Sequence, residues 1–226
     1  MTIIEHLEEL RSRLIKSIIA LVITTLFSLF FTRRILQILI APAGDIKPIF
    51  LRPTEMFITY MKVALLSGVA LAMPVIVYQL IRFVLPALMP QERRYLTIII
   101  PGATLSFLVG LAFAYFAMLP FALRYLLSFG GDLVEAKLAI AEYITFVTTL
   151  LFWAGAVFET PLLVFFLAKI GVITPQMLSR YRKYAILAIA VIAAIITPTP
   201  DPFNMMVVMV PLIVLYEIGV LLAKLA

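Results

Sequence analysis

Two carboxylates, Glu159 and Glu217, interrupt long apolar runs of this 226-residue chain. An ionised carboxylate inside a membrane span is costly unless it is solvated, paired or protonated, and such residues usually serve a function. Pro161 follows Glu159 by two residues and, lacking a backbone N–H, bends or breaks a helix. We therefore expect a kinked, hydrated segment around Glu159. Two intramembrane acids are also what a proton-coupled small-solute transporter requires.

A third acid, Glu9, lies near the amino terminus. Thr2-Ile3-Ile4-Glu5 matches a capping box, so a helix is expected to start there. At 100° per residue its apolar side chains share one face, whereas Glu5, Glu9 and Arg13 share the opposite one. This pattern predicts an amphipathic helix lying on the inner membrane surface. The simplest role for Glu9 is an i,i+4 pair with Arg13, worth a few tenths of a kcal/mol.

Glu92 and Asp201 have equally simple interpretations. Glu92 follows Pro90 at the expected start of a helix, where an acid favours the helix dipole. Asp201 precedes Pro202 and is typical of a helix N-cap. The chain has no cysteine and only one histidine, His6, so neither a metal centre, a thiol nucleophile nor an intramembrane Ser–His pair is expected. We expect no enzyme activity and no cofactor.

The elements that position these residues are predicted to be membrane helices. The chain is 64% hydrophobic and 13% charged, whereas soluble domains are about half apolar and about a quarter charged. The prediction is an all-α polytopic membrane protein whose residues 1–226 form one domain. Its six apolar runs are 14–31, 57–81, 95–119, 143–168, 184–197 and 205–223. The fifth spans only about 21 Å of a hydrocarbon core of about 30 Å.

Basic residues predict the orientation. With the amino terminus in the cytoplasm, eleven of the 18 Lys and Arg residues fall on the cytoplasmic side, so both termini are expected inside. The net charge of +6 is then explained by basic residues in cytoplasmic loops, where they contact anionic lipid headgroups. Nucleic acid is not an expected partner. The long connections 32–56 and 120–142 are expected to form a structured cap on the opposite side.

Short motifs in a fixed order support a more specific interpretation. They are His6-Leu7-Glu8-Glu9-Leu10-Arg11, Pro53-Thr54-Glu55, Pro74-Val75-Ile76-Val77-Tyr78-Gln79, Phe83, Pro86-Ala87-Leu88, Glu92-Arg93-Arg94, Phe113-Ala114-Tyr115-Phe116, Phe158-Glu159-Thr160-Pro161, Pro200-Asp201-Pro202 and Tyr216-Glu217-Ile218. With these motifs the chain resembles the TatC component of the twin-arginine protein translocase over essentially its whole length.

The resemblance implies a glove-shaped receptor of six transmembrane helices, the fifth and sixth short, in the cytoplasmic (inner) membrane. It implies binding of twin-arginine signal peptides of folded substrate proteins. It also implies contact with single-span partners of the TatA and TatB type, self-association in the complex, and export driven by the proton motive force.

The resemblance also assigns site residues. It implies that Glu9 and Glu92 recognise the paired arginines, with Phe83 and Arg11 nearby. Glu159 is expected on the concave face, while Thr197, Asp201 and Met205 border the site for partners. The alternative is a proton-coupled small-solute transporter using Glu159 and Glu217, although such transporters usually have repeated halves and this chain has no apparent repeat.

Overall fold

The computed structural model describes residues 3–44, 46–84, 96–128, 137–197 and 202–225, and nearly all of them are helical. The elements are α1 (Ile3–Leu29), α2 (Thr32–Ile40), η1 (Ala41–Ala43), α3 (Glu55–Val84), α4 (Leu96–Phe113), η4 (Ala114–Met118, a π-helix), α5 (Leu119–Ser128), α6 (Ile140–Phe158), α7 (Thr160–Lys169), α8 (Pro175–Arg180), α9 (Arg182–Ile196) and α10 (Pro202–Ala223). Within these ranges the only β-type pairing is an isolated parallel bridge between Ile49 and Ala139.

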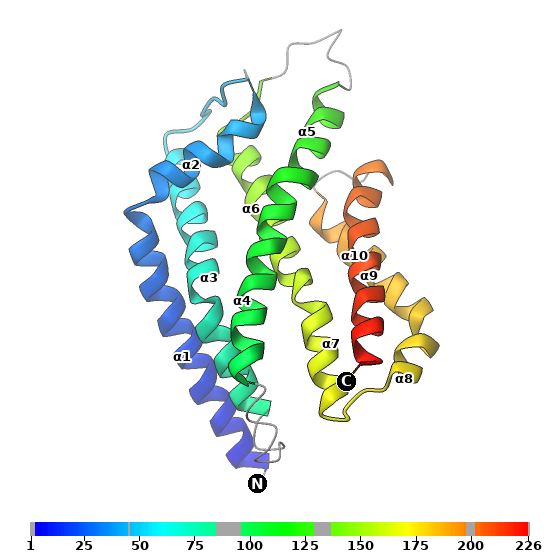
Figure 1. The fold of residues 1–226 in the computed structure, drawn as a ribbon. Helices are drawn as coiled ribbons and strands as arrows, with labels where there is room; N and C mark the ends of the chain where they lie inside the picture. The colour runs from blue at the N-terminus through cyan, green and yellow to red at the C-terminus, as the bar shows by residue number, and fades with distance from the viewer. Residues whose placement is uncertain (1–2, 45, 85–95, 129–136, 198–201, 226) are drawn as a thin grey trace.

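Five helical segments in the described part of the chain are long and apolar enough to cross a membrane. They are α1, α3, the continuous segment α4 to α5, the segment α6 to α7, and α10. Helix α9 corresponds to the fifth apolar run of the sequence. It has 15 residues and is about 22 Å long, as expected for that short run. Figure 1 shows α1 at one side of the molecule and α9 and α10 at the other, with both chain ends at the lower end.

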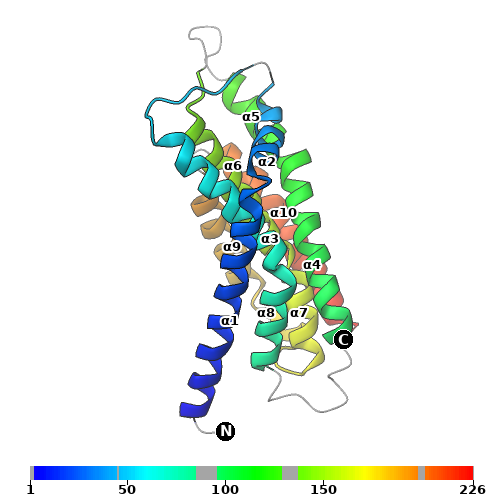
Figure 2. The same cartoon turned by 90° about the vertical axis from the view of Figure 1, so that its left-hand side faces the viewer.

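Helix α1 differs from the expectation. The amphipathic start does not form a separate surface helix, because α1 continues unbroken from Ile3 to Leu29 and appears as one rod in Figure 2. No glycine or proline interrupts this stretch, so no residue of the two strongest helix-breaking types separates its polar start from its apolar run. Thr2 of the expected capping box lies outside the described residues. The polar first turns are therefore an extension of the membrane helix.

The third rod is longer than its apolar run. The run was expected to end at residue 119, but helix continues through Ser128, which shortens the connection that follows. Pro120 is the second residue of α5, which follows the π-helix η4 without a break. Proline removes one backbone hydrogen bond of a regular α-helix. In membrane helices a local π-helical turn and neighbouring helices can satisfy the backbone groups that proline frees.

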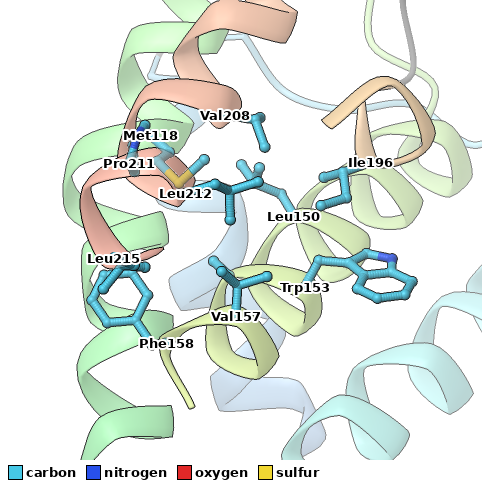
Figure 3. Close-up of a pocket in the computed structure, with 11 residues that line it drawn as sticks. Met118, Leu150, Trp153, Val157, Phe158, Ile196, Val208, Pro211, Leu212 and Leu215 are labelled. Atoms are coloured by element: carbon cyan, nitrogen blue, oxygen red, sulfur yellow. The ribbon is translucent and has the colours of Figure 1, made fainter. Parts of the chain in front are cut away.

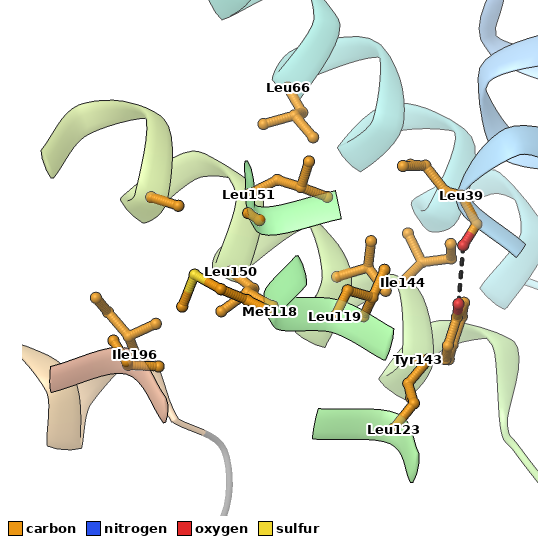
Figure 4. Packing of buried hydrophobic residues seen from close by; sticks show 14 of the residues in the cluster. Leu39, Leu66, Met118, Leu119, Leu123, Tyr143, Ile144, Leu150, Leu151 and Ile196 are labelled. Atoms are coloured by element: carbon orange, nitrogen blue, oxygen red, sulfur yellow. Dashed lines mark hydrogen bonds between the residues drawn. The ribbon is translucent and has the colours of Figure 1, made fainter. Parts of the chain in front are cut away.

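The main apolar core is built around α6. Ile144, Val147, Leu150 and Leu151 of α6 are buried against side chains of α3, η4, α5 and α9 (Figure 4). Glycine permits the close crossing of α4 and α6: a Cβ added at Gly110 would lie 2.8 Å from the Ala154 carbonyl oxygen. Small residues allow such close packing where the lipid supplies no hydrophobic drive.

The upper end forms a structured cap, as the sequence predicted. Tyr115 and Tyr143 each donate a hydrogen bond of 2.8 Å to a carbonyl near the end of α2, those of Ile38 and Leu39 respectively. The Ile49 N–H donates to Leu138, and the Ile140 N–H donates to Ile49. The two tyrosine bonds fix α2 against η4 and α6, and the Ile49 bonds join the described parts of the two long connections.

Candidate functional site

Five side chains form one strip where the amino-terminal turns of α1 meet the last turns of α3. We call this strip, made of His6, Glu9, Arg13, Gln79 and Phe83, the α1–α3 seam. The helical spacing places His6, Glu9 and Arg13 along one side of α1, and Gln79 and Phe83 one turn apart on α3. It lies at the lower end of the molecule in Figure 1, the end that carries both termini.

The Glu9 carboxylate is only partly satisfied. Its Oε1 accepts a hydrogen bond of 3.0 Å from Arg13 Nη2, so the expected i,i+4 pair is present. Its Oε2 is buried and has no hydrogen-bond partner among the described residues. Leaving such an oxygen unpaired is costly, and a hydrogen bond to a charged donor is about twice as strong as a neutral one. The seam therefore offers an acceptor suited to a cation.

Arg13 ties the two helices of the seam together. Its Nη1 donates to Gln79 Oε1 at 3.3 Å, across 66 residues of sequence. Gln79 is 8% exposed and lies in an apolar span. An uncharged polar residue in such a span signals a fixed partner, but the sequence does not say which partner. Gln79 was predicted only as part of a family motif, with no role of its own.

Phe83 lies beside His6, which is one turn before Glu9 on α1. Its ring stacks on His6 with centroids 4.4 Å apart and an interplanar angle of 23°. The structure thus brings Phe83 and Glu9, both predicted as site residues, to the same seam. Arg11 is exposed and, two residues from Glu9, points to a different side of α1. Glu92 lies outside the described residues.

Glu159 lies at the expected helix break. α6 ends at Phe158 and α7 begins at Thr160, with Pro161 in its first turn. The sequence predicted that Glu159 lies on a hydrated concave face. In the structure the side chain is buried instead, with 5% of its surface exposed. Its Oε1 is buried and has no hydrogen-bond partner among the described residues. The close approach of α4 to this break encloses the acid.

The residues expected at the partner site lie at the upper end. Thr197 closes α9 and donates 2.9 Å to the Ala193 carbonyl, and Met205 packs on the main core from the first turns of α10. Asp201 lies outside the described residues. Among those described, no hydrogen bond or ion pair joins Glu159 to Thr197 or Met205. A small apolar crevice separates α6 from α9 and α10, and Figure 3 shows its lining.

Glu217 has a structural partner. Arg182 Nη2, at the start of α9, donates to Glu217 Oε2 at 2.8 Å, and the two side chains are 49% and 39% exposed. The turn after α8 brings the start of α9 beside α10, which pairs two residues 35 positions apart. Glu217 is therefore a paired acid, and the expectation that an acid in this run serves proton transfer has no support in its geometry.

The fold and the seam together define an all-helical polytopic membrane protein with a strip of polar and aromatic side chains at one end. A family profile described as Sec-independent protein translocase protein (TatC) matches residues 5–211. The TatC protein of Carboxydothermus hydrogenoformans is 39% identical over 226 residues, covering 99% of this chain and 93% of the relative. That of Aquifex aeolicus is 41% identical, covering 100% of this chain and 96% of the relative.

A solved structure agrees with this. The crystal structure of the twin-arginine translocase receptor TatC superposes with a TM-score of 0.88 at 41% identity, covering 97% of this chain and 98% of that one. The chain belongs to the TatC family. The predicted six-helix fold and the predicted function as a Sec-independent protein translocase component are confirmed. None of these similar proteins supports the solute-transporter alternative.

Proposed function

We propose that this protein is the receptor subunit of a twin-arginine translocase and that the α1–α3 seam binds the paired arginines of signal peptides. The observation that carries the proposal is the buried Oε2 of Glu9, which has no hydrogen-bond partner among the described residues. The stacked rings of His6, one turn away on α1, and Phe83 add an aromatic surface to the same seam. The name of the similar crystal structure, a twin-arginine translocase receptor, supports the same conclusion.

The chemistry of the seam explains a preference for arginine. A guanidinium presents a planar fork of donors that can engage a carboxylate through two parallel bonds, which the point-like ammonium of lysine cannot reproduce. Glu9 would receive one arginine, and Glu92 the other. Phe83 would pack against the aliphatic stem of an arginine, and Arg11 would lie at the exposed edge of the site.

A binding assay with a twin-arginine signal peptide and its twin-lysine counterpart tests the proposal directly. We expect the purified receptor to bind the arginine peptide about ten- to a hundredfold more tightly, as expected for the loss of charged hydrogen bonds of about 1.5–3 kcal/mol. Equal affinity for the two peptides would refute arginine recognition by this subunit.

We further propose that the seam faces the cytoplasm, in the cytoplasmic (inner) membrane, with both termini on that side. The excess of basic residues in the segments at this end supports this orientation. The whole chain, residues 1–226, would act as one membrane domain.

The opposite part of the molecule is proposed to receive partners. Single-span proteins of the TatA and TatB type would pack near Thr197, Asp201 and Met205, and self-association would complete the complex for export of folded proteins driven by the proton motive force. The outer side of α9 supports this, because Leu187, Val191 and Ile195 are all more than half exposed on a helix too short to span the bilayer alone. A photocrosslinker at residue 205 should capture such partners, while one at residue 26, on α1, should not.

A further inference from the structure

A lysine on α3 lies at membrane depth without a counter-ion. Lys62 is half-buried and follows Glu55, the first residue of the helix, by seven positions. No carboxylate of the described residues forms an ion pair with it. A cation in this position is costly unless a partner or water reaches it.

Lys62 opens onto a groove between α1, α3 and α6. The groove has a volume of about 370 Å³ and is lined on its polar side by Lys62, Thr145, Thr148 and Thr149. Its remaining lining is apolar or aromatic: Leu21, Leu65, Leu66, Val69, Phe152 and Trp153. A second hollow of about 480 Å³ adjoins it across Thr145 and Thr149, toward α9. The groove thus has one polar, positively charged side and one hydrocarbon side.

The polar side has unused hydrogen-bonding capacity. Lys62 Nζ donates to Thr145 Oγ1 at 2.6 Å, and the Thr145 hydroxyl in turn donates to the Ala141 carbonyl. An ammonium has three donors, so the bond to Thr145 leaves two of them for a ligand. The Thr149 hydroxyl forms no hydrogen bond with a described residue. These groups suit an anionic oxygen.

The depth of Lys62 fits a lipid phosphate. The 29-residue span of α3 is about 44 Å long, close to the full bilayer thickness of about 40–45 Å, of which the hydrocarbon core is about 30 Å. Seven residues place Lys62 about 10 Å from the cap end of the helix, about 3 Å inside the hydrocarbon boundary. A lysine side chain extends to the headgroup level from such a depth.

We propose that this groove binds one acidic phospholipid from the leaflet on the cap side, with its phosphate on Lys62 and the threonines and an acyl chain along Leu65, Val69 and Phe152. The volume is that of a small-molecule site and is too small for a transmembrane helix about 10 Å across. The charge of Lys62 favours an anion, and the apolar wall favours a hydrocarbon chain attached to that anion. The site lies at the other end of α3 from the α1–α3 seam.

Thermal unfolding of the delipidated protein in detergent, with added phosphatidylglycerol or phosphatidylcholine, tests this. Phosphatidylglycerol should raise the melting temperature of the parent by about 2–4 °C more than phosphatidylcholine. The difference should disappear in Lys62→Gln and persist in Lys62→Arg. It should also persist in Lys47→Gln, which removes an exposed cation from the cap. Native mass spectrometry should show one retained acidic lipid per parent chain.

Val69→Trp provides a second test that does not alter the charge. The larger side chain fills the hydrocarbon side of the groove, so the larger stabilisation by phosphatidylglycerol should disappear. Equal stabilisation by the two lipids, or an unchanged preference in both Lys62→Gln and Val69→Trp, would overturn the proposal. Equal stabilisation by inorganic phosphate would also overturn it, because the acyl chain would then contribute nothing. Loss of a copurifying membrane protein from Lys62→Gln, without a change in lipid preference, would instead assign the groove to a protein partner.

Discussion

Arg13 covers one oxygen of the Glu9 carboxylate and leaves the other without a partner. The bond from Nη2 to Oε1 is 3.0 Å long, and the second nitrogen of the same guanidinium is held by Gln79 on α3. An arginine of the protein therefore already occupies half of the acceptor proposed for an arginine of the signal peptide.

The first prediction concerns this internal arginine. Arg13→Gln should strengthen binding of a twin-arginine peptide by about two- to fivefold, because an exposed or partly exposed ion pair of about 0.2–1 kcal/mol no longer competes for Glu9. Fluorescence anisotropy with a labelled peptide measures the change. Lys16→Gln, which removes an exposed charge from the same helix, is the matched control. Weaker binding by Arg13→Gln alone would mean that Arg13 positions Glu9 and does not compete with the ligand.

The second prediction concerns the two proposed recognition acids. Glu9→Gln or Glu92→Gln should each weaken peptide binding about ten- to a hundredfold, since each removes a charged hydrogen bond of about 1.5–3 kcal/mol. The preference for arginine over lysine should narrow as well. Glu8→Gln, at the exposed neighbouring position, should change little. A double variant that still prefers the arginine peptide as strongly as the parent would place recognition elsewhere.

The third prediction is the topology. The chain contains no cysteine, so single cysteines can be introduced without background. Residues 8 and 176 should react with an impermeant thiol reagent from the cytoplasmic side, and residues 47 and 137 from the other side. All four positions are exposed. Labelling of residues 8 and 47 from the same side would contradict the proposed orientation.

The fourth prediction separates function from folding at Glu159. Glu159→Gln replaces the buried carboxyl by an amide of the same size and removes the cost of burying a charge, so thermal stability should be nearly unchanged. Transport of a folded substrate should fall if the acid contacts partners or signal peptide. Glu142→Gln, exposed at the start of the same rod, serves as control. Loss of folded protein with normal transport per molecule would make Glu159 a structural residue.

The fifth prediction tests the crossing of α4 and α6. Gly110→Ala forces a Cβ to within 2.8 Å of the Ala154 carbonyl and 2.9 Å of Gly155 Cα, which are backbone atoms. The strain should cost about 1–3 kcal/mol and lower the melting temperature by about 2–4 °C per kcal/mol. At Gly102, on the same helix, the nearest atom would be a leucine methyl at 3.6 Å. Gly102→Ala should therefore be neutral or stabilising, and equal losses at both positions would exclude this explanation.

Much of the architecture could be predicted from local sequence. Long apolar runs can only satisfy their backbone groups in a membrane as helices, so their number and order follow from hydrophobicity alone. Pro161 likewise predicted the break at Glu159, because proline lacks the backbone N–H that would continue the helix. Pro74, Pro101 and Pro211 nevertheless lie inside helices, so a proline alone does not decide whether a helix breaks. The Glu9 to Arg13 pair follows from helical spacing. All of these depend on residues within a few positions of one another.

The tertiary structure decided what those helices do to individual side chains. Gln79 contacts Arg13, and Glu217 pairs with Arg182, only because packing brings together residues 66 and 35 positions apart. Glu159 and Glu217 have the same apolar context in the sequence but different environments in the structure. Glu159 is buried, whereas Glu217 is partly exposed and paired with Arg182. The length and hydrophobicity of the apolar runs determine which helices form. A side chain's partner and burial depend on which helix lies opposite it, and packing over the whole chain sets that arrangement.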